Sequence, residues 1–288
     1  MGGPSAEREV SLRSGSAVTK GLKEAGYEVF QVDVRGHDFT IQAGVEAVFV
    51  ALHGEFGEDG QIQGLLEKKK MPYTGSGPEA SRNSFDKILS KKIFVANGIL
   101  TPEYEILTKG EKRSLKLPLV VKPACQGSSI GVHRVMKESE WDLALMDAFL
   151  YGSDIVVESY IRGRELTVGI VDGEALPAVE IVAPDDWYGF DAKYTKGASR
   201  YLVPAPLDEK TCSLCRKIAM KTFNVLKCRG LGRVDFRLSE DGHLYVLELN
   251  NIPGFTETSL LPKAAAQAGI SFSSLCDRIM NTACIGKE

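Results

Sequence analysis

Two stretches in the last quarter of the chain decide its fold: Leu231-Gly232-Arg233-Val234-Asp235-Phe236-Arg237 and Leu247-Glu248-Leu249-Asn250-Asn251-Ile252-Pro253-Gly254. The first reads as a β-strand, and the second reads as the end of another strand. Glu240-Asp241-Gly242 between them is a turn signal, so the two strands are expected to pair as a hairpin. Residues that form strands poorly, among them Pro253 and Gly254, follow the second strand directly. A functional site often begins at such a strand end.

Four polar side chains share one face of this predicted hairpin. Arg233 and Asp235 are two residues apart on the first strand, as Glu248 and Asn250 are on the second, and side chains two apart point to the same face. Carboxylate and amide oxygens suit Mg²⁺, which takes few protein ligands and completes its shell with substrate phosphates. A guanidinium beside the metal can neutralise a transferring phosphoryl group. The alternative is a solvated sheet face with an ion pair; the residues that end the second strand favour the metal site.

The rest of the chain divides into regions that differ in their pattern of expected strands and helices. Strand–helix alternation over residues 1–78, with strands expected over Tyr27–Val34 and Ala47–Leu52, predicts an α/β domain with a doubly wound parallel sheet. Hairpins, one of them expected across Asp172-Gly173, and short helices then predict two α+β domains, at residues 79–162 and 163–288. Residues 183–206 show no periodicity, and so long an irregular stretch is typical of a lid over a site. The length of 288 residues is consistent with three small domains.

The composition excludes several classes of function. The chain has 35 Lys+Arg against 38 Asp+Glu, a formal net charge of -3, which argues against a general nucleic-acid or membrane-surface binder. No apolar stretch approaches the roughly 18 residues of a membrane span, and the polar start carries no secretory signal. The six scattered cysteines need no disulfide framework. We therefore expect a soluble, cytoplasmic protein that acts on small molecules.

Two further stretches suit a nucleotide. Val120-Val121-Lys122-Pro123 leads into Gln126-Gly127-Ser128-Ser129-Ile130-Gly131, where a lysine and a Gly/Ser loop can hold phosphate oxygens. Alone, such a loop is as often an ordinary hairpin loop. A base and a ribose can be bound by Glu158, the backbone near Ile161, and Glu165. Taken alone, glutamates that flank strands are ordinary surface residues.

Together these features resemble the ATP-grasp ligases and, within them, the D-alanine–D-alanine ligase family. The resemblance runs nearly from end to end. It is carried by Gly2 through Ser11, Ala51-Leu52-His53-Gly54, Tyr73 through Gly77, Asp86-Lys87, Lys122-Pro123, Gly127-Ser128-Ser129, Lys193-Tyr194, Gly232 through Asp235, and Glu248 through Leu260. The N-terminal block and the pattern Asn250…Pro253-Gly254…Ser259-Leu260 are specific to this ligase family. The lysine loop and the metal strands are shared with ATP-grasp enzymes generally.

The resemblance implies an ATP-grasp fold whose last two domains sandwich ATP, and a reaction for peptidoglycan precursor synthesis. ATP phosphorylates one D-alanine, and the amine of a second attacks the D-alanyl phosphate, which yields D-alanyl-D-alanine, ADP and phosphate. The residues implied to bind ATP are Lys87, Lys122, Glu158, Ile161, Glu165 and Lys193. The residues implied to bind two Mg²⁺ (or Mn²⁺) ions are Asp235, Glu248 and Asn250. This division suits phosphoryl transfer, which depends on positioning and charge neutralisation.

The resemblance also implies how the acyl phosphate is formed and attacked. Glu7 would pair with the ammonium of the first D-alanine, and Tyr194 and Ser128 would hold Glu7 in place. Arg233 and the backbone N–H of Gly254 would form the oxyanion hole. The presence of Tyr194 favours a dipeptide product over a D-alanyl-D-lactate product.

The second D-alanine is expected beside a predicted helix start. Ser259 and the backbone of Leu260 would cradle its carboxylate. His53 matches a histidine near the substrates, although a packing role after a strand is as good an interpretation of this residue. Lys193 would lie with Tyr194 on the lid, which would keep water from the acyl phosphate. Homodimers are usual in the family.

The chain departs from the family pattern in two places. Phe255-Thr256-Glu257-Thr258 stands where many members have Met and a nearby His, a change expected to tune the pocket for the second substrate. Only Met1 precedes Gly2-Gly3, whereas the first domain of the family begins with an apolar central strand. Losing about five buried apolar residues would remove about 7–15 kcal/mol, comparable to the stability of a whole domain, about 5–15 kcal/mol. We therefore expect either a natural start upstream or a poorly stable chain.

Several rival interpretations remain at this stage. Another ATP-grasp carboxylate–amine ligase would share Lys122 and the metal residues but has no reason to keep Glu7 with Ser259. A D-alanine–D-lactate ligase is disfavoured by the presence of Tyr194. A non-catalytic ATP-binding homologue would bind ATP without releasing phosphate. A dinucleotide-dependent oxidoreductase fits Gly75-x-Gly77-x-x-Ala80, but Pro78 interrupts that loop and no acidic residue ends a second strand at the usual distance.

Overall fold

The computed structural model describes residues 1–189, 195, 197–256 and 258–286, and its central feature is a six-stranded antiparallel sheet. The strand order is β10-β9-β5-β7-β8, and β6 pairs with β5. The strands are β5 (Gly163–Val171), β6 (Glu174–Ala175), β7 (Val179–Val182), β8 (Arg200–Leu202), β9 (Leu231–Ser239) and β10 (Leu244–Asn250). The expected Asp172-Gly173 hairpin is confirmed, because both residues adopt the left-handed backbone between β5 and β6.

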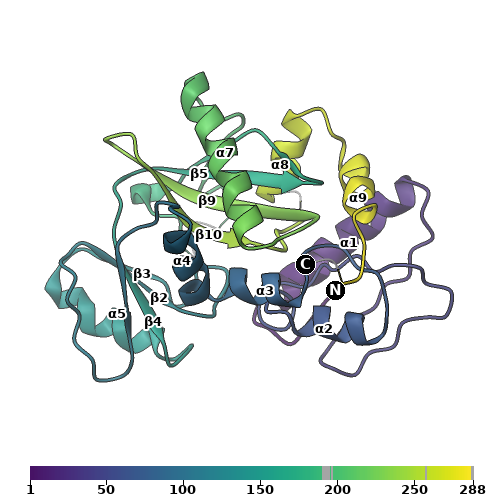
Figure 1. Cartoon of the computed structure of the whole chain (residues 1–288), viewed down its shortest axis with the longest axis horizontal. Helices are drawn as coiled ribbons and strands as arrows, with labels where there is room; N and C mark the ends of the chain where they lie inside the picture. Colours follow the sequence, from purple (N-terminus) through teal and green to yellow (C-terminus); the bar gives the residue numbers. More distant parts are fainter. Residues whose placement is uncertain (190–194, 196, 257, 287–288) are drawn as a thin grey trace.

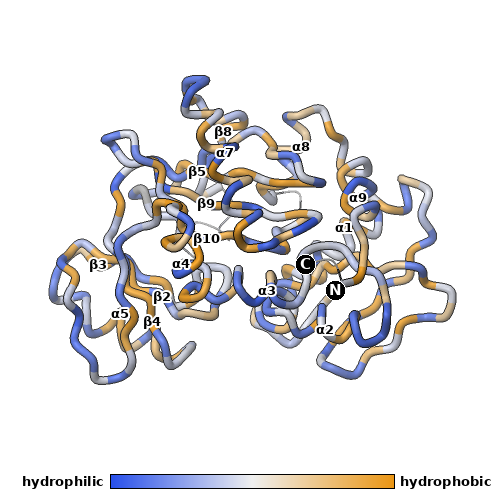
Figure 2. Tube along the Cα trace, viewed as in Figure 1, coloured by the Kyte–Doolittle hydropathy of each residue, from blue (hydrophilic) through white to orange (hydrophobic). Residues whose placement is uncertain are grey.

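Helices pack on both faces of this sheet (Figure 1). On one face, α7 (Glu209–Val225) buries Phe223 with Phe236 of β9, and α4 (Lys87–Ala96) adds Phe94 to the same core. On the other face lies α8 (Leu260–Gln267), whose Leu261 lies so close to β5 that a Cβ at Gly169 would be 2.5 Å from it. Figure 2 shows the hydrophobic stretches along β9 and β10, between these layers.

A smaller four-stranded sheet lies beside the first, in the order β1-β4-β2-β3. Its strands are β1 (Tyr104–Leu107), β2 (Leu119–Pro123), β3 (His133–Val135) and β4 (Ile155–Ser159). The β-branched run of β2 is buried at every residue, and α5 (Trp141–Ala148), which follows the short 3₁₀ helix Glu138–Glu140, covers one face. The Gly/Ser loop connects β2 to β3, as expected.

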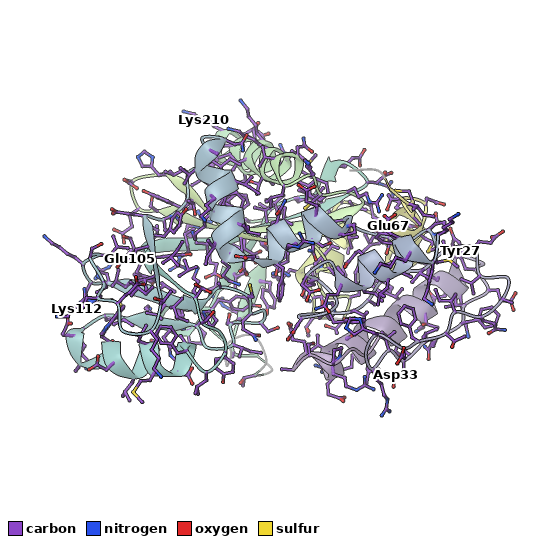
Figure 3. All side chains as sticks on the ribbon, turned by 60° about the horizontal axis from the view of Figure 1, so that its bottom comes forward. Tyr27, Asp33, Glu67, Glu105, Lys112 and Lys210 are labelled. Atoms are coloured by element: carbon purple, nitrogen blue, oxygen red, sulfur yellow. The ribbon has the colours of Figure 1, made fainter. Side chains whose placement is uncertain are left out.

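The N-terminal region is built from helices and extended segments. Its helices are α1 (Arg8–Glu24), α2 (Gln61–Lys68) and α3 (Pro78–Phe85). Val18 and Leu22 of α1 pack against α9 (Phe272–Met280), so the two ends of the chain share one core. Figure 3 places Tyr27 and Asp33 of this region at the end of the molecule opposite Glu105 and Lys112.

The strands expected over Tyr27–Val34 and Ala47–Leu52 are not formed, and this corrects the prediction. Among the described residues, the β pairings of these segments are single parallel bridges, Gly2 with Val34 and Val48 with Tyr73. A cavity of about 640 Å³ is lined by both segments. A strand needs a hydrogen-bonded neighbour along its length, and within the described residues the cavity, rather than such a neighbour, lies against both segments. Neither segment therefore forms a strand ladder, and burial differs along them: Val50 and Leu52 are buried, whereas Phe30 is exposed.

Within the described part of the chain, no helix is both long and apolar enough to cross a bilayer.

Candidate active site

A pocket lies between the two sheets, and most of the residues predicted to bind nucleotide and metal line it. They are Lys87, Lys122, Ser128, Glu158, Ile161, Glu165, Asp235 and Glu248. The Gly/Ser loop forms one wall. Trp187 and Tyr188, which follow the 3₁₀ helix Pro184–Asp186, also line the pocket and belong to the segment expected to act as a lid.

The hairpin of β9 and β10 has the predicted convergence of polar groups. Glu248 stands opposite Asp235 and Asn250 opposite Arg233, with an irregularity in the ladder between Val246 and Glu248. Arg233 donates twice to Asp235, at 2.9 and 2.7 Å, and Asn250 Nδ2 donates to Asp235 Oδ2 at 2.9 Å. Asp235 lines the pocket and is thereby held in a fixed orientation, with its charge balanced by a half-buried guanidinium.

The donor set of this hairpin fits Mg²⁺. It offers two carboxylates and an amide oxygen, which are hard ligands on neighbouring strands, and Mg²⁺ needs few such ligands when phosphates supply the rest. No cluster of three His, Cys, Asp or Glu side chains suited to a metal occurs among the residues that the structure describes. A cation at this hairpin would therefore depend on the bound substrate for part of its shell.

The Gly/Ser loop is held in a strained conformation next to Lys87. Ser128 and Ser129 have φ values of 51° and 59°, in the left-handed region that residues other than glycine rarely adopt. Lys87 Nζ donates to the carbonyl oxygen of Gln126 at 2.6 Å and lies 3.5 Å from Glu248 Oε2. One ammonium therefore connects the Gly/Ser loop to β10. Such strain persists where the surrounding structure enforces it, often at ligand clamps.

Glu7 reaches this loop from the N-terminal region. Its carboxylate accepts a short hydrogen bond from Ser128, the contact predicted for these two residues. Two glycines make room for it: a Cβ at Gly54 would lie 2.6 Å from Glu7 Oε2, and a Cβ at Gly127 would collide with the same oxygen. The Glu7 carboxylate is thus enclosed between Gly54 of the N-terminal region and the Gly/Ser loop.

The end of the pocket expected to hold adenosine is rich in buried ion pairs. Lys122 Nζ lies 2.8 Å from Glu158 Oε2, and Glu158 is 1% exposed. Arg237 lies 3.2 Å from Glu165 Oε2 and donates to the carbonyl oxygen of Ile161 at 3.1 Å. The predicted residues therefore lie together, and protein cations already fix both carboxylates.

Gly254, Ser259 and Leu260 also lie together. Ser259 is the N-cap of α8, Leu260 is its first residue, and a Cβ at Gly254 would lie 2.8 Å from Ser259 Oγ. Ser259 Oγ accepts from the backbone N–H of Thr256 at 2.9 Å. This turn exposes the first N–H groups of α8, which favour an anion.

His53 is enclosed by protein on both ring nitrogens. Nδ1 lies 3.1 Å from the carbonyl oxygen of Ile252, which can only accept, so Nδ1 carries the proton. Nε2 then accepts from Ser14 Oγ at 2.9 Å, and Ser14 Oγ in turn accepts from the N–H of Phe255 at 3.2 Å. Burial lowers the pKa of His53 to about 4. These contacts favour the packing interpretation: a neutral imidazole that positions residues 252–255.

Glu58 is a buried carboxyl that the sequence reasoning missed. It accepts from the N–H of Gly54 at 2.6 Å and from the backbone of Ile252. Burial, followed by repulsion from Glu7, raises the pKa of Glu58 to about 8, although Arg233 opposes the shift. The group is therefore mostly protonated near neutral pH. The only sequence signal is an acidic residue inside the glycine-rich stretch 54–60.

Two predicted residues cannot be placed, and two further buried polar residues went unpredicted. Lys193 and Tyr194 lie outside the described residues. Lys91, one helical turn after Lys87, binds Glu158. Asn251 Nδ2 donates to the carbonyl oxygen of Glu58 at 2.8 Å and so links the turn after β10 to the N-terminal region.

Comparison with protein families gives two matches that together span most of the chain. The family model described as "D-ala D-ala ligase N-terminus" matches residues 35–76, and the one described as "D-ala D-ala ligase C-terminus" matches residues 93–281. A D-alanine–D-alanine ligase of Methylacidiphilum infernorum is 47% identical over 97% of this chain and 92% of its own length. Another, from Syntrophotalea carbinolica, is 46% identical over 100% of this chain and 95% of its own.

Comparison with solved structures agrees with the family matches. The crystal structure of a Bacillus anthracis D-alanine–D-alanine ligase complexed with ATP superposes with a TM-score of 0.86 at 34% identity, covering 98% of this chain and 94% of that one. A second structure of the Bacillus anthracis ligase superposes with a TM-score of 0.85 at 36% identity. The predicted ATP-grasp fold is confirmed by these likenesses.

Proposed function

We propose that this chain, which belongs to the D-alanine–D-alanine ligase family, joins two molecules of D-alanine to D-alanyl-D-alanine and converts ATP to ADP and phosphate. The observation that supports this most directly is the contact of Glu7 with Ser128. It joins the expected site of the amino-acid ammonium to the expected phosphate loop. A carboxylate of bound D-alanine is then within reach of a terminal phosphate, as acyl phosphate formation requires.

Each end of ATP has a proposed set of partners. Lys87 and Lys122, which both line the pocket, neutralise phosphate charge together with Lys193. Glu158 and Glu165 face the base and the ribose. Tyr160 and Trp187 line the same pocket, and their aromatic surfaces suit a purine.

We propose that Asp235, Glu248 and Asn250 hold two Mg²⁺ (or Mn²⁺) ions. When bound, the ions neutralise phosphate charge during transfer. The chain itself contributes the orientation of Asp235, whose oxygens are aligned by Asn250 and by Thr167 at 2.5 Å. Arg233 keeps its charge beside Asp235 and is available to the oxyanion that forms when the second amine attacks.

The first and second substrates occupy different walls of the site. Glu7, held by Ser128 and in our proposal by Tyr194, binds the ammonium of the first D-alanine. The N–H of Gly254 joins Arg233 at the oxyanion. Ser259 and the start of α8 bind the carboxylate of the second D-alanine.

The wider assignments rest on the same proposal. ATP is an intracellular co-substrate, so we infer a cytoplasmic location, and we propose a homodimer with no nucleic-acid or membrane partner. The domain division at residues 1–78, 79–162 and 163–288 is also a proposal.

The decisive experiment is phosphate release from MgATP in four parallel reactions: D-alanine, L-alanine, D-alanine with D-lactate, and no amino acid. We expect release only where D-alanine is present, with D-alanyl-D-alanine as the product in both such reactions. Phosphate release that does not depend on D-alanine would point to another ATP-grasp ligase. ATP binding without phosphate release would point to a non-catalytic homologue. D-alanyl-D-lactate as the main product would indicate a depsipeptide ligase.

A further inference from the structure

Lys91 is a fully buried lysine without a role in the chemistry above. It lies on α4, one turn after Lys87, and is 0% exposed. Its Nζ lies 3.0 Å from Glu158 Oε1 and donates to Thr101 Oγ1 at 2.7 Å. The ring of Tyr104 stands below the ammonium, with its centroid 5.2 Å away. Burying an ammonium costs several kcal/mol unless it is paired. The position of Lys91 beside Glu158 therefore needs a functional explanation.

Two lysines share the Glu158 carboxylate between them. Lys91 binds Oε1, and Lys122 binds Oε2 at 2.8 Å. Glu158 and Lys122 line the pocket, whereas Lys91 does not. Burial acts to raise the pKa of Glu158, but Lys122 and Lys91 outweigh burial and hold it below its usual range. Glu158 therefore presents an ionised carboxylate to the pocket in a fixed orientation.

We propose that Lys91 is a positioning residue that determines nucleotide specificity: by binding one oxygen of Glu158, it keeps this carboxylate a pure hydrogen-bond acceptor. The inference rests on the proposed function, in which Glu158 faces the purine of ATP. A purine with a 6-amino group can donate to such an acceptor. A 6-oxo purine presents a carbonyl oxygen instead, which leaves two buried acceptors facing each other without a proton.

Both lysines are required by this argument. If Lys122 alone remained, Glu158 Oε1 would be buried without a cation. It would then be easier to protonate or to rotate, and a protonated carboxyl donates to a 6-oxo group. The selectivity of the pocket between the two purines thus depends on a side chain that does not line it.

The test compares ATP with inosine triphosphate, which differs at the 6-position of the base. The variants are Lys91→Met, Lys91→Arg and, as the matched control, Lys92→Met, which removes the neighbouring exposed lysine of the same helix. For each, kcat and KM are measured with both nucleotides at saturating D-alanine, and binding of both nucleotides is measured by calorimetry.

We expect the wild-type enzyme to prefer ATP at least tenfold in kcat/KM. Lys91→Met should reduce that preference at least fivefold by raising the KM for ATP, with kcat changed less than twofold. Lys91→Arg should restore most of the preference, and Lys92→Met should retain it. If Lys91→Met does not fold, Lys91→Gln serves in its place, because its amide can still donate to Thr101.

Three results would overturn the proposal: a wild-type enzyme that does not distinguish the two nucleotides, an unchanged preference in the Lys91 variant, or an equal loss for both nucleotides. The last would mean that Lys91 only supports packing. Failure of the proposed function is separate, because the wild-type enzyme would then release no phosphate with D-alanine. The calorimetric preference for ATP over inosine triphosphate would still test Lys91.

Discussion

Replacing His53 with Asn should change how the stability of the protein depends on pH. His53 is buried and neutral, and its pKa falls from 6.5 to about 4. A base with a depressed pKa contributes stability that is present above pH 6.5 and is lost as the pH falls towards 4, because only the unfolded chain takes up the proton. The full effect corresponds to about 3 kcal/mol. At pH 5, about 2 kcal/mol of it should already be lost.

The measurement is urea unfolding of wild type and His53→Asn at pH 7, 6 and 5. Asn can keep one of the two hydrogen bonds, so the variant should lose about 1 kcal/mol at pH 7. Other groups also titrate in this range, and Glu58 does so with the opposite sign, so the quantity of interest is the difference between the two proteins. We expect this difference to shrink and then reverse towards pH 5.

The control is His243→Asn, which removes an exposed imidazole with 62% of its side chain accessible. NMR of the ring protons adds an independent reading, since His53 should remain neutral down to about pH 5. A difference in unfolding free energy between wild type and His53→Asn that stays constant from pH 7 to pH 5 would refute the reasoning, and so would ring titration of His53 near pH 6.5.

The remaining predictions concern the proposed D-alanine site at Glu7, the proposed oxyanion hole at Arg233 and the buried carboxyl of Glu58. Gly127→Ala places a methyl group against the Glu7 carboxylate, so the KM for D-alanine at saturating ATP should rise at least about tenfold. An unchanged KM would contradict the proposal that Glu7 binds the first D-alanine. Arg233→Ala should reduce turnover by about 10²–10³ or more while calorimetry still detects ATP binding, and near-normal turnover would remove Arg233 from the oxyanion hole. The pKa of Glu58 is raised from 4.5 to about 8, so its stabilisation is present below pH 4.5 and is lost as the pH rises to 8. Between pH 5 and 8, wild type should therefore lose roughly 3 kcal/mol relative to Glu58→Gln, and parallel pH–stability curves would rule this out.

Sequence patterns were most informative where the structure depends on local spacing. The β9–β10 hairpin follows from two alternating runs and an Asp-Gly turn, and its register places Glu248 opposite Asp235 as the face argument requires. The segments Tyr27–Val34 and Ala47–Leu52 show the limit of this reasoning. Their patterns are those of buried strands, but a ladder also needs a neighbour, and a cavity of about 640 Å³ lies against both.

The sequence by itself determined the family, the ATP-grasp fold and the grouping of charged residues around one pocket, because these depend on motifs that each span a few residues. Only the tertiary structure decided what the buried polar groups do. His53 is assigned to positioning by partners on α1 and at Ile252, Glu58 is held protonated beside Glu7, and Glu158 is shared by Lys91 and Lys122. Burial and charge set the protonation of such groups, and both arise from side chains that the folded chain brings together from distant positions.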